Sequence, residues 1–219
     1  MRLVRLPGVY RPQGDTGLLA EALLDAGLRP GSAVLDVGTG TGALAIAAAR
    51  AGAGRVLAVD VSRRAVLAAR LNTALRGLPV RVARTDVLRH ELLERFDVIV
   101  SNPPYVPAPE PTVPTRGRAR AWDAGRDGRA LLDRLCALAP ALLHPRGTLL
   151  LVHSALSDVD TTLRRLRGSR LAASVVARRR QEFGPVLRGR TALLEDRGLI
   201  APGQREEELV VVRGERPAD

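Results

Sequence analysis

Short apolar runs alternate with helical patterns along most of the chain. Runs rich in Val, Leu and Ala predict strands at 33–37, 55–60, 80–83, 96–100 and 147–153. Apolar residues spaced three and four positions apart predict a helix that begins at Asp15-Thr16, and further helices over 43–51, 63–76, 127–143 and 156–168. Strands and helices that alternate in this way favour a parallel sheet with helices on both faces.

The end of the chain breaks this alternation. Two further strands, at 172–180 and 207–212, have no clear helical pattern between them, only a basic and irregular piece. They are therefore expected to close one edge of the sheet as an antiparallel pair. The predicted fold is α/β, a doubly wound, mostly parallel seven-stranded sheet of the Rossmann-like type with an antiparallel edge.

No repeat or composition break divides the 219 residues, so a single domain over 1–219 is predicted. Residues 1–13 form an N-terminal arm before the first helix. Residues 106–126 carry prolines and arginines with no period of either kind. A loop of this length inside a compact domain is usually functional or disordered, so this segment is predicted to be the substrate loop.

Composition limits the classes of protein to consider. All 34 basic residues are arginine against 23 acidic residues, and the net charge of +11 suits a polyanionic partner such as nucleic acid. A GC-rich genome would produce the same bias, and both readings stay open. Cys136 is the only cysteine, which excludes a disulfide framework or a cysteine zinc cluster.

Targeting and metal-binding signals are absent from the sequence. No apolar run approaches the roughly 20 residues of a membrane span, and the N-terminus lacks the apolar core of a signal peptide, so a cytoplasmic protein without membrane contact is expected. The three histidines are scattered, and His90, His144 and His153 are expected to be solvated or to cap helix and strand ends. No metal site is predicted.

Glycines follow the first predicted strand and open the next helix. Gly38, Gly40 and Gly42 are typical of a nucleotide-type ligand, although a structural turn or a dinucleotide site fits the same spacing. Asp36 lies just before them, where a carboxylate can meet an ammonium group but would repel a pyrophosphate. Asp60 ends the next strand, where it can accept hydrogen bonds from both hydroxyls of a ribose.

A third aspartate extends the row. Asp86 follows the third strand, where it can accept a hydrogen bond from an adenine amino group, although a solvated or capping carboxylate would look the same. Ligands of open α/β sheets bind at the carboxyl ends of the strands, where all three aspartates lie. An adenosine with an amino-acid tail fits this row, so S-adenosyl-L-methionine is the predicted cofactor.

The fourth strand ends abruptly in Asn102-Pro103-Pro104-Tyr105. Neither proline can donate to a strand ladder, and each restricts the residue before it, so this turn is stiff and extended. The Asn102 side-chain oxygen and the Pro103 carbonyl are placed to accept the two N–H groups of a planar NH₂. Pro104 stiffens the turn, and Tyr105 is expected to pack on the planar group. All four residues are predicted to be catalytic.

These motifs resemble those of a known family. Residues 36–42 resemble motif I of class I S-adenosylmethionine-dependent methyltransferases, and Asn102-Pro103-Pro104-Tyr105 is similar to their amino-methylating NPPY signature. Three further stretches are similar to the HemK/PrmC-type protein-glutamine methyltransferases: Tyr10–Thr16, which these enzymes place over the cofactor, Ser101 before the Asn, and Ala121–Gly128 after their substrate loop. The resemblance covers roughly residues 9–153.

The resemblance implies a function and a set of site residues. It implies methylation of the glutamine amide in the Gly-Gly-Gln motif of a peptide-chain release factor. The implied cofactor-binding residues are Thr16, Asp36, Gly38, Gly40, Gly42, Asp60, Val61, Asp86, Val87 and Asn102. The implied substrate-binding residues are Asn102, Pro103, Tyr105, Arg116 and Trp122.

Several alternatives stay open. Bacterial members of the family carry a helical N-terminal domain that has no room here, and the short form is more similar to a branch that works with a small zinc-binding activator subunit. The same turn also suits adenine or guanine amines of nucleic acid, or a protein lysine, and a non-catalytic binding module is a third class. Trp122 can either fill the base of the substrate loop or contact substrate. Arg116, Arg118 and Arg120 can either hold substrate or be solvated.

Overall fold

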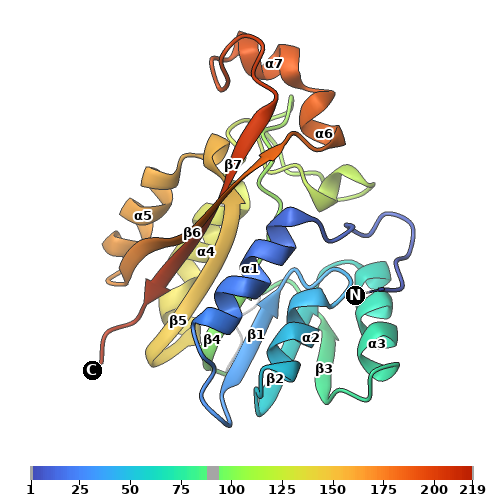
Figure 1. Ribbon diagram of the computed structural model, residues 1–219, viewed down its shortest axis with the longest axis vertical. Coiled ribbons are helices and arrows are strands. Elements are labelled where there is room, and N and C mark those ends of the chain that lie inside the picture. The colour runs from blue at the N-terminus through green and yellow to red at the C-terminus, as the bar shows by residue number, and fades with distance from the viewer. Residues whose placement is uncertain (1, 88–93, 219) are drawn as a thin grey trace.

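The computed structural model of the chain describes residues 2–87 and 94–218 (Figure 1). Their strands form one seven-stranded sheet in the order β3-β2-β1-β4-β5-β7-β6. The strands are β1 Ala33–Val37, β2 Arg55–Asp60, β3 Val80–Arg84, β4 Phe96–Ser101, β5 Leu143–Ser154, β6 Ala172–Glu182 and β7 Glu206–Glu215.

Strand pairing confirms the predicted fold class. β1 pairs in parallel with β2 and β4, β2 with β3, and β4 with β5. β7 runs antiparallel between β5 and β6, which makes the far edge the antiparallel pair that the sequence predicts. The chain leaves β1 in one direction toward β2 and β3, and β4 and β5 lie on its other side. β1 and β4 therefore flank the switch point, where open α/β sheets bind their ligands.

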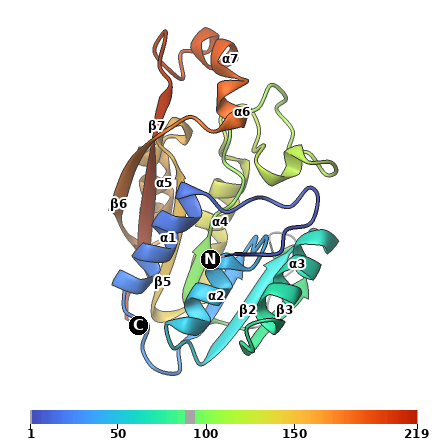
Figure 2. The same ribbon diagram turned by 45° about the vertical axis from the view of Figure 1, so that its right-hand side comes forward.

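Helices cover both faces of the sheet. α1, α2 and α3 lie on one face and α4 and α5 on the other (Figure 2). The helices are α1 Gly14–Asp25, α2 Ala43–Arg50, α3 Arg63–Ala74, α4 Ala130–Leu142, α5 Val159–Gly168, α6 Pro185–Arg188 and α7 Thr191–Asp196, with two 3₁₀ turns, η1 Ala119–Ala121 and η2 Ala155–Ser157. None of the helices described is long and apolar enough to cross a membrane.

The core is built from Leu, Val and Ala with few aromatic rings. Leu149, Leu150 and Leu151 on β5 are fully buried, as are Phe96 on β4 and Leu35 on β1. Because helices cover both faces, side chains on both sides of these central strands are excluded from water. Cys136 of α4 is buried in the same core, and burial raises the pKa of its thiol to about 11.

Two predictions made from the sequence are wrong. The piece between β6 and β7 is ordered: α6 and α7 pack a small core of their own from Phe183, Leu187, Leu194 and Ile200. His153 is fully buried near the end of β5, where burial lowers its pKa to about 4, so the solvated role is wrong. Its Nδ1 makes a hydrogen bond of 2.8 Å with the Ser154 carbonyl at the end of that strand. His144 is half-buried at the start of β5, and His90 lies outside the described residues.

Candidate active site at the switch point

The predicted site residues gather along one edge of the sheet. Asp86, Asp60, Asp36 and Asn102 lie at or just beyond the carboxyl ends of β3, β2, β1 and β4, which are neighbours in that order. The parallel pairing of the four strands brings these residues together from well-separated positions in the chain. The arm of residues 2–13 passes the same end of the sheet (Figure 1).

The glycine turn needs left-handed backbone at three positions. Gly38, Gly40 and Gly42 have φ values of 74°, 56° and 83°, a region that other residues rarely adopt. A Cβ at Gly38 would meet no atom within 4 Å, so open space remains there for a ligand. A Cβ at Gly42 would lie 3.2 Å from the Cα of Ala69, so this glycine permits the close approach of α2 to α3.

Asp36 is fully buried and only half of its carboxyl is satisfied. Its Oδ2 accepts hydrogen bonds from Thr39 Oγ1 at 2.6 Å and from the Ala45 amide at 3.0 Å. Its Oδ1 has no hydrogen-bond partner among the described residues. Burial raises the pKa of this carboxyl to about 7, against the effect of the two hydrogen bonds. An ammonium group would supply both the missing hydrogen-bond donor and the opposite charge. The Asp36 carboxylate therefore fits the amino-acid end of the predicted cofactor.

Asp60 is held by backbone amides on both oxygens. Oδ2 accepts from the Gly40 amide at 3.0 Å, and Oδ1 accepts from the Ser62 amide at 2.8 Å. Burial raises the pKa of this carboxyl, opposed by these hydrogen bonds and by the charge of Arg120. Each oxygen keeps acceptor capacity for a hydroxyl group, which suits a ribose.

The remaining residues of the predicted cofactor site follow β2 and β3. Val61 is half-buried directly after β2, and its carbonyl accepts a hydrogen bond from Arg84 Nε at 3.2 Å. Asp86 is half-buried two residues beyond β3, and Val87 is buried in the core with 4% of its surface exposed.

The Asn102–Tyr105 turn is fixed by side-chain hydrogen bonds to other elements. Ser101 Oγ donates to the Val37 carbonyl of β1 at 2.8 Å, Asn102 Nδ2 donates to Thr16 Oγ1 at 3.1 Å, and the Tyr105 hydroxyl donates to Asp15 Oδ2 at 3.1 Å. Within the described residues, no hydrogen bond uses Asn102 Oδ1 or the Pro103 carbonyl oxygen. Two hydrogen-bond acceptors without a partner among the described residues therefore lie on a turn that side-chain hydrogen bonds hold in place.

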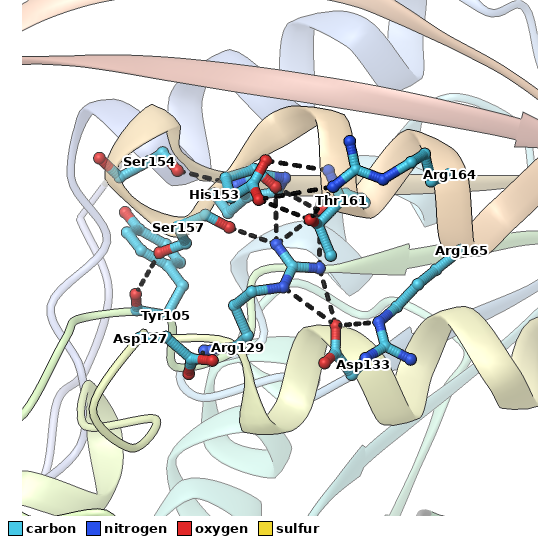
Figure 3. Close-up of polar contacts among 12 residues, drawn as sticks. Tyr105, Asp127, Arg129, Asp133, His153, Ser154, Ser157, Thr161, Arg164 and Arg165 are labelled. Carbon is cyan, nitrogen blue, oxygen red and sulfur yellow. Dashed lines mark hydrogen bonds and ion pairs between the residues drawn. The ribbon is translucent and has the colours of Figure 1, made fainter. Parts of the chain in front are cut away.

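A buried arginine holds the far end of this turn (Figure 3). Ser157 Oγ donates to the Tyr105 carbonyl oxygen at 2.7 Å. Arg129, with 5% of its surface exposed, donates to the Ser157 carbonyl, to the Asp158 carbonyl at 2.7 Å, and to Asp133 at 2.7 Å. The network joins the start of α4, η2 and the start of α5 to the backbone of Tyr105.

The predicted substrate loop is closed at its base by backbone hydrogen bonds. The Val106 amide donates to the Trp122 carbonyl at 2.8 Å, and the Ala108 amide donates to the Gly125 carbonyl at 2.8 Å. Trp122 is half-buried at this base, and Arg116 is exposed further out in the loop. The structure therefore places Arg116 away from the buried part of the site.

Two arginines of the α6–α7 unit hold the base of the loop from outside. Arg190 Nη1 forms an ion pair with Asp123 Oδ1 at 2.7 Å, off the axis of a hydrogen bond, and donates to the Pro107 carbonyl at 2.9 Å. Arg197 donates to the carbonyls of Ala108 at 2.8 Å and Pro109 at 3.1 Å. The unit that looks irregular in the sequence thus supports the segment that follows the Asn102–Tyr105 turn.

Several residues that support the site carry weak sequence signals. Asp15 is predicted as a helix start and as part of the Tyr10–Thr16 stretch, with no role of its own, yet it is 2% exposed and hydrogen-bonded to the turn. Arg129 and Arg190 are two of many arginines, and nothing in their spacing separates a buried arginine from a solvated one. Ser157 lies inside a predicted helix. The only usable signal is that Asp15, a charged residue, adjoins the apolar face of its predicted helix.

Comparison with known proteins shows that the chain is similar to methyltransferases. The family model of the methyltransferase small domain matches residues 1–114. A Methanocaldococcus jannaschii protein assigned by name to the protein N5-glutamine methyltransferases is 32% identical over 177 residues, which cover 81% of this chain and 88% of the relative. Methyltransferase HEMK2 of Mus musculus is 36% identical over 66% of this chain and 71% of its own length. The release factor glutamine methyltransferase of Mycobacterium tuberculosis is 33% identical over 91% and 70%.

Solved structures share the fold. The E. cuniculi Mtq2–Trm112 complex, described as responsible for the methylation of the translation termination factor eRF1, matches with a TM-score of 0.65 and 25% identity over 95% of this chain and 99% of that chain. The T. thermophilus 16S rRNA N2 G1207 methyltransferase, solved with AdoMet and guanosine, matches with a TM-score of 0.64 and 23% identity over 97% of this chain and 46% of that chain. At that identity, the second match shows similarity of fold.

Proposed function

We propose that this chain, which belongs to the protein N5-glutamine methyltransferases of the methyltransferase small domain family, methylates the side-chain amide of the glutamine in the Gly-Gly-Gln motif of a peptide-chain release factor. One observation carries the proposal. Asn102 Oδ1 and the Pro103 carbonyl are two acceptors with no partner among the described residues, on a turn held rigid at the switch point of the sheet.

The cofactor of this family is S-adenosyl-L-methionine, which when bound supplies an electrophilic sulfonium methyl group. The residues present fit it, because Asp36 offers a buried oxygen without a partner and Gly38 leaves open space at the strand edge. We assign the ammonium group to Asp36, the ribose hydroxyls to Asp60 and the adenine amine to Asp86. The site is completed by its glycine turn, with Gly40 and Gly42, and by two apolar wall residues, Val61 and Val87.

The chain itself has to hold a poor nucleophile in place. The lone pair of an amide nitrogen is delocalised, so placement and charge do most of what a protein can do for this reaction. Asn102 Oδ1 and the Pro103 carbonyl each accept one N–H, which fixes the nitrogen and increases its electron density. Pro104 keeps the two acceptors apart at a fixed spacing.

Tyr105 supports this arrangement mainly as a buried residue that anchors the turn. Tyr105 has 8% of its surface exposed and its hydroxyl is committed to Asp15, so little of the residue remains for contact with the planar substrate group. Burial raises the pKa of this hydroxyl well above its usual value, so it stays protonated and donating at physiological pH. Trp122 and Arg116 are assigned to the outer part of the substrate site.

The relatives named as glutamine methyltransferases support a protein amide as the substrate, and the net charge supports a second candidate. Methylation of an amino group of nucleic acid fits the net charge of +11 and the exposed Arg116 and Arg118 of the substrate loop. Few aromatic rings are available to stack a flipped base, which argues against nucleic acid as the substrate. Nearly all of them are Tyr10, Tyr105 and Trp122, and Tyr105 is buried.

A small zinc-binding activator subunit is part of the proposal. It is supported by Mtq2, which was solved together with Trm112. It is also supported by Leu67, Leu71 and Leu75, which are 51%, 40% and 71% exposed at a spacing of four residues along α3 and its C-terminal end. Replacing Leu71 and Leu75 by Glu is expected to prevent the stoichiometric co-purification of such a subunit. Full activity of the wild-type chain purified alone would contradict this part of the proposal.

One assay tests the proposed substrate. The purified chain, without and with its co-purifying subunit, is incubated with methyl-labelled S-adenosyl-L-methionine and separately with release factor, histone-type lysine-rich protein, tRNA, rRNA and DNA. We expect label on the release factor only. Label on nucleic acid or on lysine with none on the release factor would overturn the proposal.

A further inference from the structure

One buried carboxylate connects the N-terminal arm to the Asn102–Tyr105 turn. Asp15 Oδ2 accepts hydrogen bonds from the hydroxyls of Tyr10 at 2.7 Å and Tyr105 at 3.1 Å. Its Oδ1 accepts from the amide of Thr16 at 2.6 Å and from the Thr16 hydroxyl at 3.2 Å. All four neighbours are donors, so Asp15 acts as an acceptor at each of its contacts.

The direction of these hydrogen bonds determines the direction of the hydrogen bond between Thr16 and Asn102. A threonine hydroxyl has a single hydrogen, and Thr16 directs it to Asp15. Thr16 Oγ1 can then only accept from its other neighbour, so the group of Asn102 that faces it has to be the NH₂. The opposite orientation of the amide would set two acceptor oxygens against each other inside a water-poor site.

The orientation of Asn102 decides what the turn offers to a substrate. With Nδ2 bonded to Thr16, Oδ1 points away from Thr16 as an unused acceptor. If the Thr16 hydroxyl instead donated to Oδ1, the NH₂ of Asn102 would be the group left for the substrate. A donor would then face the N–H groups of the incoming amide, and the nitrogen would not be held.

We propose that Asp15 and Thr16 are positioning residues, which orient the Asn102 amide through the chain of hydrogen bonds Asp15–Thr16–Asn102 so that Oδ1 faces the substrate NH₂. This rests on the proposed function of Asn102. It replaces a direct cofactor contact as the role of Thr16, and it gives Asp15 a role of its own within the Tyr10–Thr16 stretch. Neither residue touches the reacting atoms.

Substitutions at Thr16 separate orientation from cofactor binding. Thr16→Val keeps the shape of the side chain and removes the hydroxyl, whereas Thr16→Ser keeps the hydroxyl. We expect T16V to lower kcat about tenfold or more at saturating S-adenosyl-L-methionine, with the cofactor Kd unchanged, and T16S to restore most of kcat. T73V is the matched control, because Thr73 is a buried threonine whose hydroxyl bonds only within α3.

A second variant covers the case in which T16V does not fold. Asp15→Asn replaces one acceptor oxygen by a donor, so it is expected to lower kcat by a similar factor. Because both residues act through one chain, the double variant should lose no more than the stronger single variant. Wild-type kcat in T16V or D15N, or a loss confined to cofactor affinity, would overturn the proposal.

A readout that needs no substrate keeps the proposal distinct from the proposed function. The side-chain NH₂ resonances of Asn102 are assigned by their loss in N102A. They are expected to shift in T16V and D15N but not in T16S or T73V, even if the release factor proves not to be the substrate. Unshifted Asn102 resonances in folded T16V would contradict the orientation role.

Discussion

Buried carboxylates at this site are expected to make cofactor binding depend on pH. Asp36 is the clearest case, because its pKa of about 7 leaves the carboxyl protonated for about half of the time at neutral pH. The ionised form is the one that an ammonium group stabilises. Cofactor binding should therefore displace the proton of Asp36, and the cofactor affinity should depend on pH.

The sign of this dependence follows from the raised pKa of Asp36. Between about pH 5.5 and pH 7 the ionised fraction of its carboxyl rises steeply, so the affinity for S-adenosyl-L-methionine should increase by about tenfold over this range. Calorimetric titration at several pH values measures it. Asp60 also has a raised pKa, and D36N, which keeps Asp60, should bind weakly and lose most of the slope. A flat profile in the wild-type chain would refute the assignment of Asp36.

Asn102 is expected to matter for transfer and little for cofactor affinity. Asn102→Ala removes one of the two acceptors for the substrate NH₂ and should lower kcat by about a hundredfold or more. Calorimetry should show a cofactor Kd within about threefold of wild type, a range typical of the loss of less than one net hydrogen bond. Substantial methyl transfer by N102A would mean that the turn does not hold the nitrogen in the way described.

At the scale of elements, the Asn102–Tyr105 turn depends on the start of α4. Gly128 has a φ of 72°, and a Cβ there would overlap the Tyr105 carbonyl oxygen and lie 2.7 Å from Ser157 Oγ. The hydrogen bond from Ser157 and the network of Arg129 would both have to shift (Figure 3). This glycine therefore couples the position of α4 to the turn.

Gly128→Ala should lower the free energy of unfolding by more than the cost of placing alanine in left-handed backbone. Gly77 provides the control, since its φ is 61° and a Cβ there would meet nothing within 4 Å. G77A should lower the free energy of unfolding by on the order of 1–2 kcal/mol, and G128A by about 1–3 kcal/mol more because of the overlap. Urea denaturation measures both. Equal losses in the two variants would show that the contact with Tyr105 is unimportant.

The α6–α7 unit should influence substrate binding through the loop that it holds. Arg190→Gln removes the ion pair to Asp123 at the loop base, and the KM for release factor should rise about tenfold with kcat and cofactor affinity little changed. Arg178→Gln is the control, because Arg178 on β6 is exposed and its ion pair with Glu208 on β7 lies outside the loop and its base. An unchanged KM in R190Q would separate the unit from substrate binding.

The sequence predicts the elements that carry a clear period and misses those that do not. Every strand is found near its observed place, because apolar runs bounded by Gly, Pro and Asp are a strong signal. α6 and α7, with 4 and 6 residues, are too short to show a helical period, and packing around Phe183 and Leu194 holds them instead. The helix predicted from 127 begins only at Ala130, since Gly128 adopts left-handed backbone.

At the scale of the whole molecule, the sheet order explains why local motifs form one site. Four strand ends that are adjacent in space collect Asp86, Asp60, Asp36 and Asn102, and the sequence predicts this because alternating strands and helices impose a parallel order. The supports of the site come from elements that follow no strand of this edge in the sequence pattern. Asp15, Arg129 and Arg190 belong to three elements whose approach to the turn depends on tertiary packing.

The arm closes the carboxyl edge of the sheet in a way that sequence alone does not reveal. Asn72 of α3 is fully buried and exchanges two hydrogen bonds with the backbone of Val4, each 2.8 Å long. Arg64 donates to the Pro7 carbonyl at 3.2 Å. Between these contacts and Tyr10 on Asp15, the arm is attached at both ends across the region assigned to the cofactor (Figure 2).

We propose above that the Asn102–Tyr105 turn holds a glutamine amide for methyl transfer. The direct measurement is mass spectrometry of a purified release factor after incubation with S-adenosyl-L-methionine and either the wild-type chain or N102A. We expect one added methyl group on the glutamine of the Gly-Gly-Gln motif with the wild-type chain, and an unmodified glutamine with N102A. An unmodified glutamine with a wild-type chain that binds the cofactor and methylates another substrate would contradict it.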